Sequence, residues 1–302
     1  MTRFQPFFII GAPASGTALV QTALNRYSQI EVIPPTNFFS LLRLSERRQH
    51  DHWRRIEQRL QIRVDPPARR LRAGAEARQQ FERIATDYLV RLDRSGITHV
   101  GEMSPGLQCQ IPLILRTFPE AKLVLIYRDG REVALSLTRL PGKRGRLFGH
   151  FLTWLRYYRI QRRLVRQQPQ RVFCMRYEDL VINPDDEIRL ASRFLGIGGE
   201  PENPEENDQP GGRSEDKAPG DPGLRLTSDL AACGQTSLPR QELASLERWG
   251  GWALRELHYE CSGEMRRLLP PWLTPTECCR FTYEWALHRL HGLWTNGPDP
   301  AL

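Results

Sequence analysis

Short apolar runs alternate with longer amphipathic segments along most of the chain, and this alternation limits the possible fold more than any other feature. The apolar runs at residues 7–10, 97–100, 121–127 and 171–175 predict buried strands. Between and after them, apolar side chains recur at helical spacing and predict helices over residues 17–26, 76–93, 108–118, 130–139, 147–166 and 184–195. Strands and helices in this order predict an α/β protein with three layers, a central parallel sheet flanked by helices.

The length of 302 residues is enough for one large α/β domain, which we expect to span residues 1–262. Between Gly198 and Gly223 the composition shifts to Pro, Gly, Glu, Asp and Asn, and a segment with so few apolar side chains predicts a mobile loop. Residues 263–302 are predicted to form a C-terminal helical extension, because Thr274-Pro275-Thr276-Glu277 is typical of a capping box.

Several protein classes are disfavoured by composition. The chain has no run near the ~20 apolar residues that cross a bilayer, and its first apolar run is too short for a signal peptide, so we expect no transmembrane segment and a cytoplasmic location. The six cysteines form no C-x-x-C pair and lack a matching histidine cluster, so we expect neither a metal site nor a disulfide framework.

The formal charge of +8 is unevenly distributed. From Arg139 to Arg171 the chain carries ten Arg and Lys residues and no acidic residue. This run either faces an anionic ligand or forms a solvated helix face, and the sequence leaves both interpretations open. No nucleic-acid recognition motif accompanies the charge, so nucleic-acid binding is not expected.

A glycine-rich turn follows the first predicted strand. The residues Gly11-Ala12-Pro13-Ala14-Ser15-Gly16-Thr17 join this strand to a helix, an arrangement whose backbone N–H groups suit a phosphate. The spacing matches a Walker A loop, but Thr17 and Ala18 stand where that motif has Lys and a hydroxyl residue. A Mg²⁺-dependent ATP-binding site is therefore disfavoured.

A second anion-binding signal follows the strand at residues 121–127. Arg128 is expected at the carboxyl end of this strand, where open α/β sheets bind ligands, and Ser136 lies two helical turns into the next helix. A guanidinium group together with a hydroxyl group suits a phosphate monoester. Asp129 is positioned to cap that helix.

Taken together, these segments resemble the sulfotransferase family, in particular its bacterial carbohydrate or general branch. The turn at residues 10–17 resembles the family's 5′-phosphosulfate loop, and residues 127–136 resemble its 3′-phosphate motif, including the eight-residue step from Arg128 to Ser136. The same resemblance extends to Gly101-Glu102-Met103-Ser104-Pro105, to Arg176-Tyr177-Glu178-Asp179-Leu180, to Phe194-Leu195-Gly196 and to Arg255-Glu256-Leu257-His258-Tyr259. It covers roughly residues 5–260 and implies a P-loop-like fold.

The resemblance implies transfer of a sulfuryl group from 3′-phosphoadenosine-5′-phosphosulfate (PAPS) to a hydroxyl or amine, without a metal. The acceptor would be a carbohydrate, a lipid or a small metabolite, and a homodimer stays open. The residues that would hold the nucleotide are Ala12, Pro13, Ala14, Ser15, Gly16, Thr17 and Ala18 in the loop, with Arg128 and Ser136 at the 3′-phosphate.

The chain departs from the family pattern at positions that carry chemistry. The family's loop has Lys or Arg where this chain has Ala14, and the glycan-modifying branch has Glu where this chain has Thr36. Glu102 is our candidate for the catalytic base, and an ion pair with a nearby arginine is the alternative role. The departures also motivate an alternative function: a catalytically impaired member of this fold that only binds the 3′,5′-phosphorylated nucleotide or a partner.

Overall fold

The computed structural model describes residues 4–104, 106–140, 146–199, 201 and 238–261. The chain consists of two compact units, within each of which residues contact one another more than they contact the rest. The first unit contains Met1–Tyr127 and Ile160–Ala232, and the second contains Arg128–Arg159 and Cys233–Leu302. We describe each unit by itself.

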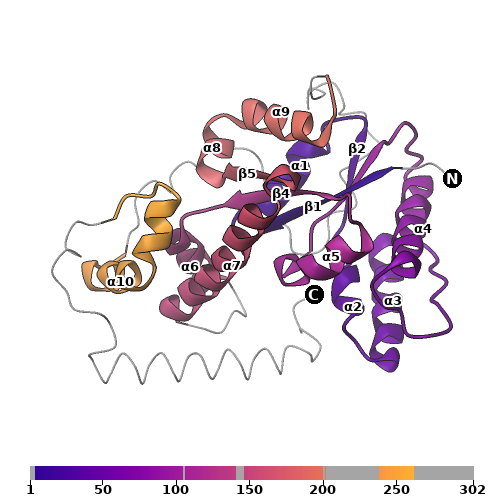
Figure 1. Cartoon of the computed structure of the whole chain (residues 1–302), viewed down its shortest axis with the longest axis horizontal. Coiled ribbons are helices and arrows are strands. Elements are labelled where there is room, and N and C mark those ends of the chain that lie inside the picture. The colour runs from indigo at the N-terminus through magenta and orange to yellow at the C-terminus, as the bar shows by residue number, and fades with distance from the viewer. Residues whose placement is uncertain (1–3, 105, 141–145, 200, 202–237, 262–302) are drawn as a thin grey trace. The chain divides into compact units, whose positions relative to one another are not determined.

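A five-stranded parallel sheet forms the centre of the first unit (Figure 1). Its strands lie in the order β2-β3-β1-β4-β5, so the first strand of the chain lies in the middle. The strands are β1 (Gln5–Gly11), β2 (Ile30–Ile33), β3 (His99–Glu102), β4 (Lys122–Tyr127) and β5 (Val172–Arg176). Because all five run in the same direction, the segments that follow them begin at one edge of the sheet.

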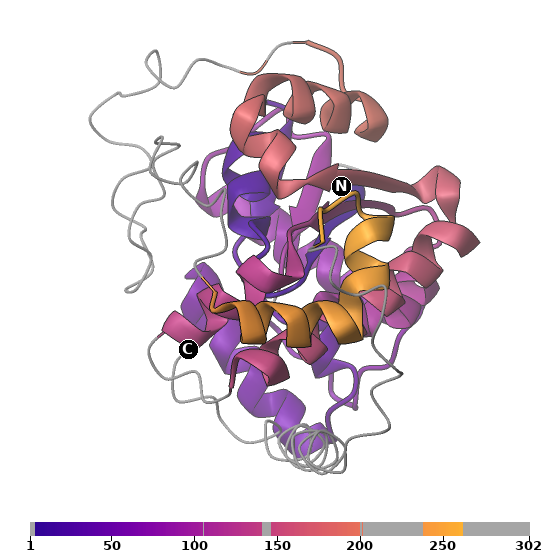
Figure 2. The same ribbon diagram turned by 90° about the vertical axis from the view of Figure 1, so that its left-hand side faces the viewer.

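Helices cover one face of this sheet with a core that is mostly aliphatic. Phe7 and Ile9 of β1, together with Val124 and Ile126 of β4, belong to one buried cluster with side chains of α1 (Thr17–Leu24), α8 (Tyr177–Ile182) and α9 (Pro184–Leu195). Figure 2 shows α8 and α9, in salmon, from a second direction. The alternation of β1 side chains places Phe8 on the opposite face.

The opposite face of the sheet is covered by an aromatic core. The Phe8 ring centroid lies 5.2–6.0 Å from those of Phe39, Phe81 and Phe118. These rings come from α2 (Phe38–Leu41), α4 (Ala75–Arg91) and the end of α5 (Ile111–Thr117). Helix α3 (Glu46–Leu60) packs beside α2, where the Trp53 and Phe38 rings lie 6.1 Å apart. The sheet therefore has apolar helices on both faces, as a buried parallel sheet requires.

The second unit contains α6 (Gly130–Arg139), the first part of α7 (Leu147–Gln167), and α10 (Arg240–Glu256). Close approach between these helices depends on glycine, because a Cβ at Gly130 would overlap the Trp154 ring and one at Gly250 would overlap the Phe151 ring. Aromatic pairs extend the contact, with ring centroids 5.8 Å apart for Phe148 and Trp249.

The predicted fold class is confirmed, and most predicted elements lie within two residues of the observed ones. The strand predicted at residues 97–100 is shifted, since β3 runs from His99 to Glu102. Residues 108–118 begin with a 3₁₀ turn, η1 (Leu107–Gln110), before α5. The short elements β2, α2 and α8 were not predicted, and neither was the 15-residue helix α3.

Two predicted segments lie largely or wholly outside the described residues. They are the mobile loop at 198–223, of which residues 198, 199 and 201 are described, and the extension at 263–302. The domain boundary at residue 262 remains a prediction. No helix within the described residues is both long and apolar enough to cross a membrane.

Candidate functional site

The turn between β1 and α1 has two residues in the left-handed region of backbone conformation. Ala14 has φ +61° and Gly16, the N-cap of α1, has φ +96°, so two of its residues are left-handed. The Ser15 N–H donates to the Ala12 carbonyl over 3.1 Å, which closes the turn. A left-handed residue without glycine's freedom costs about 1–2 kcal/mol, so the loop holds strain at Ala14.

Glycine is required at position 16 for a second reason. A Cβ at Gly16 would lie 2.5 Å from Cδ2 of Tyr177 and 3.3 Å from Cδ1 of Ile126. The Tyr177 ring, at the start of α8, therefore packs directly against the beginning of α1. Sequence reasoning placed Tyr177 in a family-like motif but did not predict this contact with the loop.

A buried hydroxyl group lies inside the same turn. Ser15 is 1% exposed, and within the described residues its Oγ has no hydrogen-bond partner. A buried hydroxyl group without a partner is costly, so a ligand that bonds to it would be favoured. The turn therefore offers a polar group and a helix N-terminus to an anion.

The candidate base Glu102 ends β3 and is held by two hydroxyl groups. Thr36 Oγ1 donates to Glu102 Oε1, and Ser104 Oγ donates to the same oxygen over 2.7 Å. The hydroxyl groups are themselves oriented by backbone amides, since Thr36 Oγ1 accepts from the Phe38 N–H and Ser104 Oγ accepts from the Asn37 N–H. Two positions that the sequence offered separately, Thr36 and Glu102, are thus direct neighbours.

The Glu102 carboxyl is fully buried, at 0% exposure. Burial raises its pKa above the ordinary value, and the hydrogen bonds from Thr36 and Ser104 oppose that shift only in part. Among the described residues, no arginine forms an ion pair with Glu102, so the alternative role that the sequence left open has no support there. Both hydroxyl groups contact Oε1, and within the described residues Oε2 has no hydrogen-bond partner.

In the second unit, Arg128 and Asp129 precede α6. Arg128 is 8% exposed, and its carbonyl accepts from Trp154 Nε1 over 3.2 Å. Asp129 accepts from the Arg131 N–H over 2.8 Å, which confirms the predicted cap. Ser136 lies on α6 as predicted and is half-buried.

Arg131 is held in a buried network that the sequence did not predict. Its guanidinium contacts Asp129 Oδ2 at 2.6 Å and Glu247 Oε1 of α10 at 2.6 Å. Although burial disfavours the charged form, the hydrogen bonds and charges of Asp129 and Glu247 raise the pKa of Arg131. Arg131 is therefore a structural cation that connects α10 to the beginning of α6.

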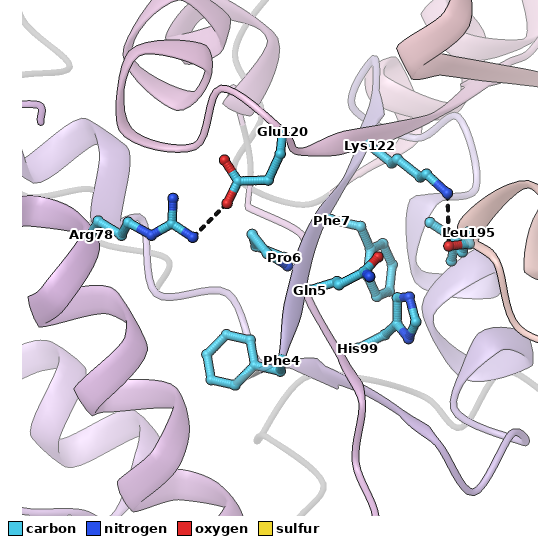
Figure 3. Close-up of a pocket in the computed structure, with 9 residues that line it drawn as sticks. All are labelled: Phe4, Gln5, Pro6, Phe7, Arg78, His99, Glu120, Lys122 and Leu195. Carbon is cyan, nitrogen blue, oxygen red and sulfur yellow. Dashed lines mark hydrogen bonds and ion pairs between the residues drawn. The ribbon is translucent and has the colours of Figure 1, made fainter. Parts of the chain in front are cut away.

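A cavity of about 430 Å³ lies at the amino-terminal ends of the strands (Figure 3). It is lined by the first residues of three strands, Gln5, His99 and Lys122. Lys122 Nζ donates to the carbonyls of Phe194 and Leu195 over 2.6 and 2.8 Å, which closes the end of α9. This cavity is at the amino ends of the strands, away from the turn that follows Gly11.

The family model described as "Sulfotransferase family" matches residues 6–201, about two thirds of the chain. The chain belongs to this family. The match includes the turn, Glu102, Arg128, Ser136 and Tyr177, while α10 lies outside it. No curated protein matches this sulfotransferase in sequence.

Solved structures of sulfotransferase domains share the fold. The domain from the Synechococcus PCC 7002 olefin synthase superposes with a TM-score of 0.57 at 18% identity, covering 87% of this chain and 98% of that domain. A sulfotransferase domain from the curacin biosynthetic pathway gives a TM-score of 0.55 at 17% identity, covering 86% of this chain and 100% of that domain. At these identities the likeness establishes the P-loop-like fold alone.

Proposed function

We propose that this sulfotransferase moves a sulfuryl group from PAPS to a hydroxyl or amine of a carbohydrate, lipid or small-metabolite acceptor. The observation that carries the proposal is the turn at residues 11–17, with left-handed backbone at Ala14 and Gly16 and a buried Ser15 Oγ that has no partner in the described part of the chain. In a chain of this family, such a turn suits the 5′ end of the nucleotide.

The nucleotide would be held by two sets of residues. The loop at residues 12–18 would bind the 5′ end through its backbone N–H groups, apart from Pro13, which has none, and Ser15, whose N–H donates to Ala12, and through the hydroxyl groups of Ser15 and Thr17. Arg128 and Ser136 would bind the 3′-phosphate, the group that distinguishes this nucleotide from ATP. PAPS would supply the sulfuryl group: a bond forms between the acceptor oxygen or nitrogen and sulfur, and the bond from sulfur to the bridging oxygen breaks.

The acceptor also loses a proton, and Glu102 is the proposed destination. Glu102 is fully buried and Thr36, whose hydroxyl donates to it, is 4% exposed, so the proton would pass first to Thr36 Oγ1 while the Thr36 proton moves to Glu102 Oε1. Glu102 therefore acts through Thr36 and does not touch the acceptor. We expect Thr36→Ser to retain transfer and Thr36→Val to lose it by about 100-fold, because valine keeps the shape without the hydroxyl.

Ala14 favours a second candidate function, a nucleotide-binding protein that does not transfer the sulfuryl group. A cation at this position would stabilise the negative charge that develops on the bridging oxygen, and loss of one such group costs about 100-fold or more in rate. If wild-type protein binds the nucleotide without transfer and Ala14→Lys also fails to transfer, this second function holds.

The first experiment is calorimetric titration with adenosine 3′,5′-bisphosphate, with ATP and Mg²⁺ as the comparison ligand. We expect the bisphosphate to bind the wild-type protein, and Arg128→Ala to weaken binding by about tenfold or more, because a charged hydrogen bond is lost. Arg139→Ala is the control, since it removes an exposed arginine from the last residue of α6, the helix that Arg128 precedes. Equal binding of ATP, or no effect of Arg128→Ala, contradicts the proposal.

A further inference from the structure

Helix α3 carries a row of three arginines and one histidine. The segment from Arg43 to Arg72 has ten arginines against four acidic residues, and α3 lies within it. Along α3, Arg48, His52, Arg55 and Arg59 are spaced by four, three and four residues, so they lie along one stripe of the helix. We call these four residues the α3 stripe.

The α3 stripe is anchored to the segment that carries Thr36. His52 Nε2 donates to the Thr36 carbonyl over 3.0 Å, and Arg59 Nη1 donates to the Pro35 carbonyl over 3.1 Å. Burial lowers the pKa of His52 and the neighbouring Arg55 charge lowers it further, in keeping with a guanidinium close to this ring. The stripe thus borders Thr36, the hydroxyl group to which we assign the acceptor's proton.

The arginines of the stripe are available to a ligand. Arg48, Arg55 and Arg59 are exposed, and no carboxylate of the described residues forms a salt bridge with them. Of the acids near these arginines, Asp65 pairs with Arg83 and Glu57 accepts from the Val64 N–H. Asp51 lies three residues after Arg48 and four before Arg55, and it is exposed and forms no salt bridge within the described residues. The three arginines of the stripe therefore keep a net positive charge against this single neighbouring carboxylate.

From these observations we infer that the acceptor is an acidic oligosaccharide whose negative groups bind along the α3 stripe. This inference rests on the proposed function and names its acceptor class. Arg48 and Arg59 are eleven residues apart, about 16 Å along the helix, which is too far for one small anion to bridge. A chain that carries repeated carboxylate or sulfate groups matches this spacing, and arginine pairs well with both groups.

Two other polyanionic partners fit the described surface less well. Single-stranded nucleic acid would need exposed aromatic rings for its bases, whereas Trp53, the aromatic residue of α3, is 3% exposed. An anionic membrane surface would need apolar side chains to insert, and the exposed large apolar residues of the described chain are outside α3: Val90, Leu140, Ile182 and Leu190.

The test compares two double variants of the same helix. Arg48→Ser/Arg55→Ser removes two cations of the stripe, while Arg47→Ser/Arg54→Ser removes two exposed arginines that lie about 100° further round the helix. The probes are a fluorescently labelled oligogalacturonate, maltohexaose as a neutral chain, and a single-stranded DNA oligonucleotide, with binding followed by anisotropy at two salt concentrations.

We expect the oligogalacturonate to bind the wild-type protein, with a lower affinity at the higher salt concentration than at the lower one. Maltohexaose should not bind. The stripe variant should lose about five- to tenfold in affinity and the control variant less than about twofold. Equal losses in both variants, no binding of the oligogalacturonate, or tighter binding of the DNA would each overturn the inference.

This experiment can fail or succeed independently of the test of the proposed function. Neither double variant changes a residue assigned to the nucleotide, so titration with adenosine 3′,5′-bisphosphate should give the same affinity in both variants and the wild type. If the bisphosphate fails to bind while the oligogalacturonate binds through the stripe, the proposed transfer is wrong and the acidic-oligosaccharide site stands as a binding site only.

Discussion

Replacement of Gly16 by alanine tests the geometry of the nucleotide turn most directly. Two separate costs are expected. The left-handed φ of +96° costs alanine about 1–2 kcal/mol, and a Cβ 2.5 Å from the Tyr177 ring forces the ring or the helix to move, at about 1–3 kcal/mol. Alanine also stiffens the unfolded chain, which offsets about 0.4–1 kcal/mol. The free energy of unfolding should therefore fall by about 3 kcal/mol, within a range of about 1–5 kcal/mol.

The matched control is Gly96→Ala. Gly96 also has a positive φ, of +77°, but a Cβ there would meet nothing within 4 Å. This variant therefore reports the backbone cost without the overlap, and its free energy of unfolding should fall by about 1 kcal/mol or less. Urea unfolding of both variants, followed by circular dichroism, measures the difference, and a thermal midpoint lowered by ~5–15 °C should accompany Gly16→Ala.

A double-mutant cycle then identifies the ring as the cause. In a Tyr177→Leu background the overlap is relieved, so Gly16→Ala should cost about 1–3 kcal/mol less than it does in the wild type. If Gly16→Ala is no more destabilising than Gly96→Ala, or if the cycle shows no coupling, then Tyr177 does not pack on the turn as described and the reasoning is refuted.

Three further variants test other parts of the structure. Burial raises the folded-state pKa of Glu102 above the unfolded value near 4.5, so this carboxyl lowers the free energy of unfolding as pH rises through the folded-state pKa. Glu102→Gln should remove that loss in urea unfolding at pH 5–8. An unchanged dependence of stability on pH would contradict this prediction. Glu247→Ala should lower the free energy of unfolding by about 3 kcal/mol in the same assay, because it leaves part of the buried Arg131 charge uncompensated. A loss below about 1 kcal/mol would show that the contact between Arg131 and Glu247 does not stabilise the fold. Gly250→Ala should cost about 1–3 kcal/mol through its overlap with Phe151, whereas an unchanged unfolding midpoint would show that the two helices are not in close contact.

The sequence by itself determined most of the local elements, though not β2, α2, α3 or α8, and it indicated the family. Hydrophobic periodicity gave α4, α6 and α7 to within about two residues, since a stripe of apolar residues at helical spacing has one stable arrangement against a core. The near-continuous apolar run of β4 predicted a strand buried on both faces, and this is observed. The turn at residues 11–17 was predicted because its glycines and its position between strand and helix are local properties.

The tertiary structure alone decided which distant residues meet. Thr36 and Glu102 are 66 residues apart, and they touch because β2 and β3 are neighbours in the sheet, with Ile33 opposite Glu102. Local sequence carries little information on strand order, and the four-residue β2 is too short for periodicity to reveal. Glu247 likewise meets Arg131 across 116 residues. Contacts of this kind depend on how helices and strands pack, so their chemistry became visible only in the folded chain.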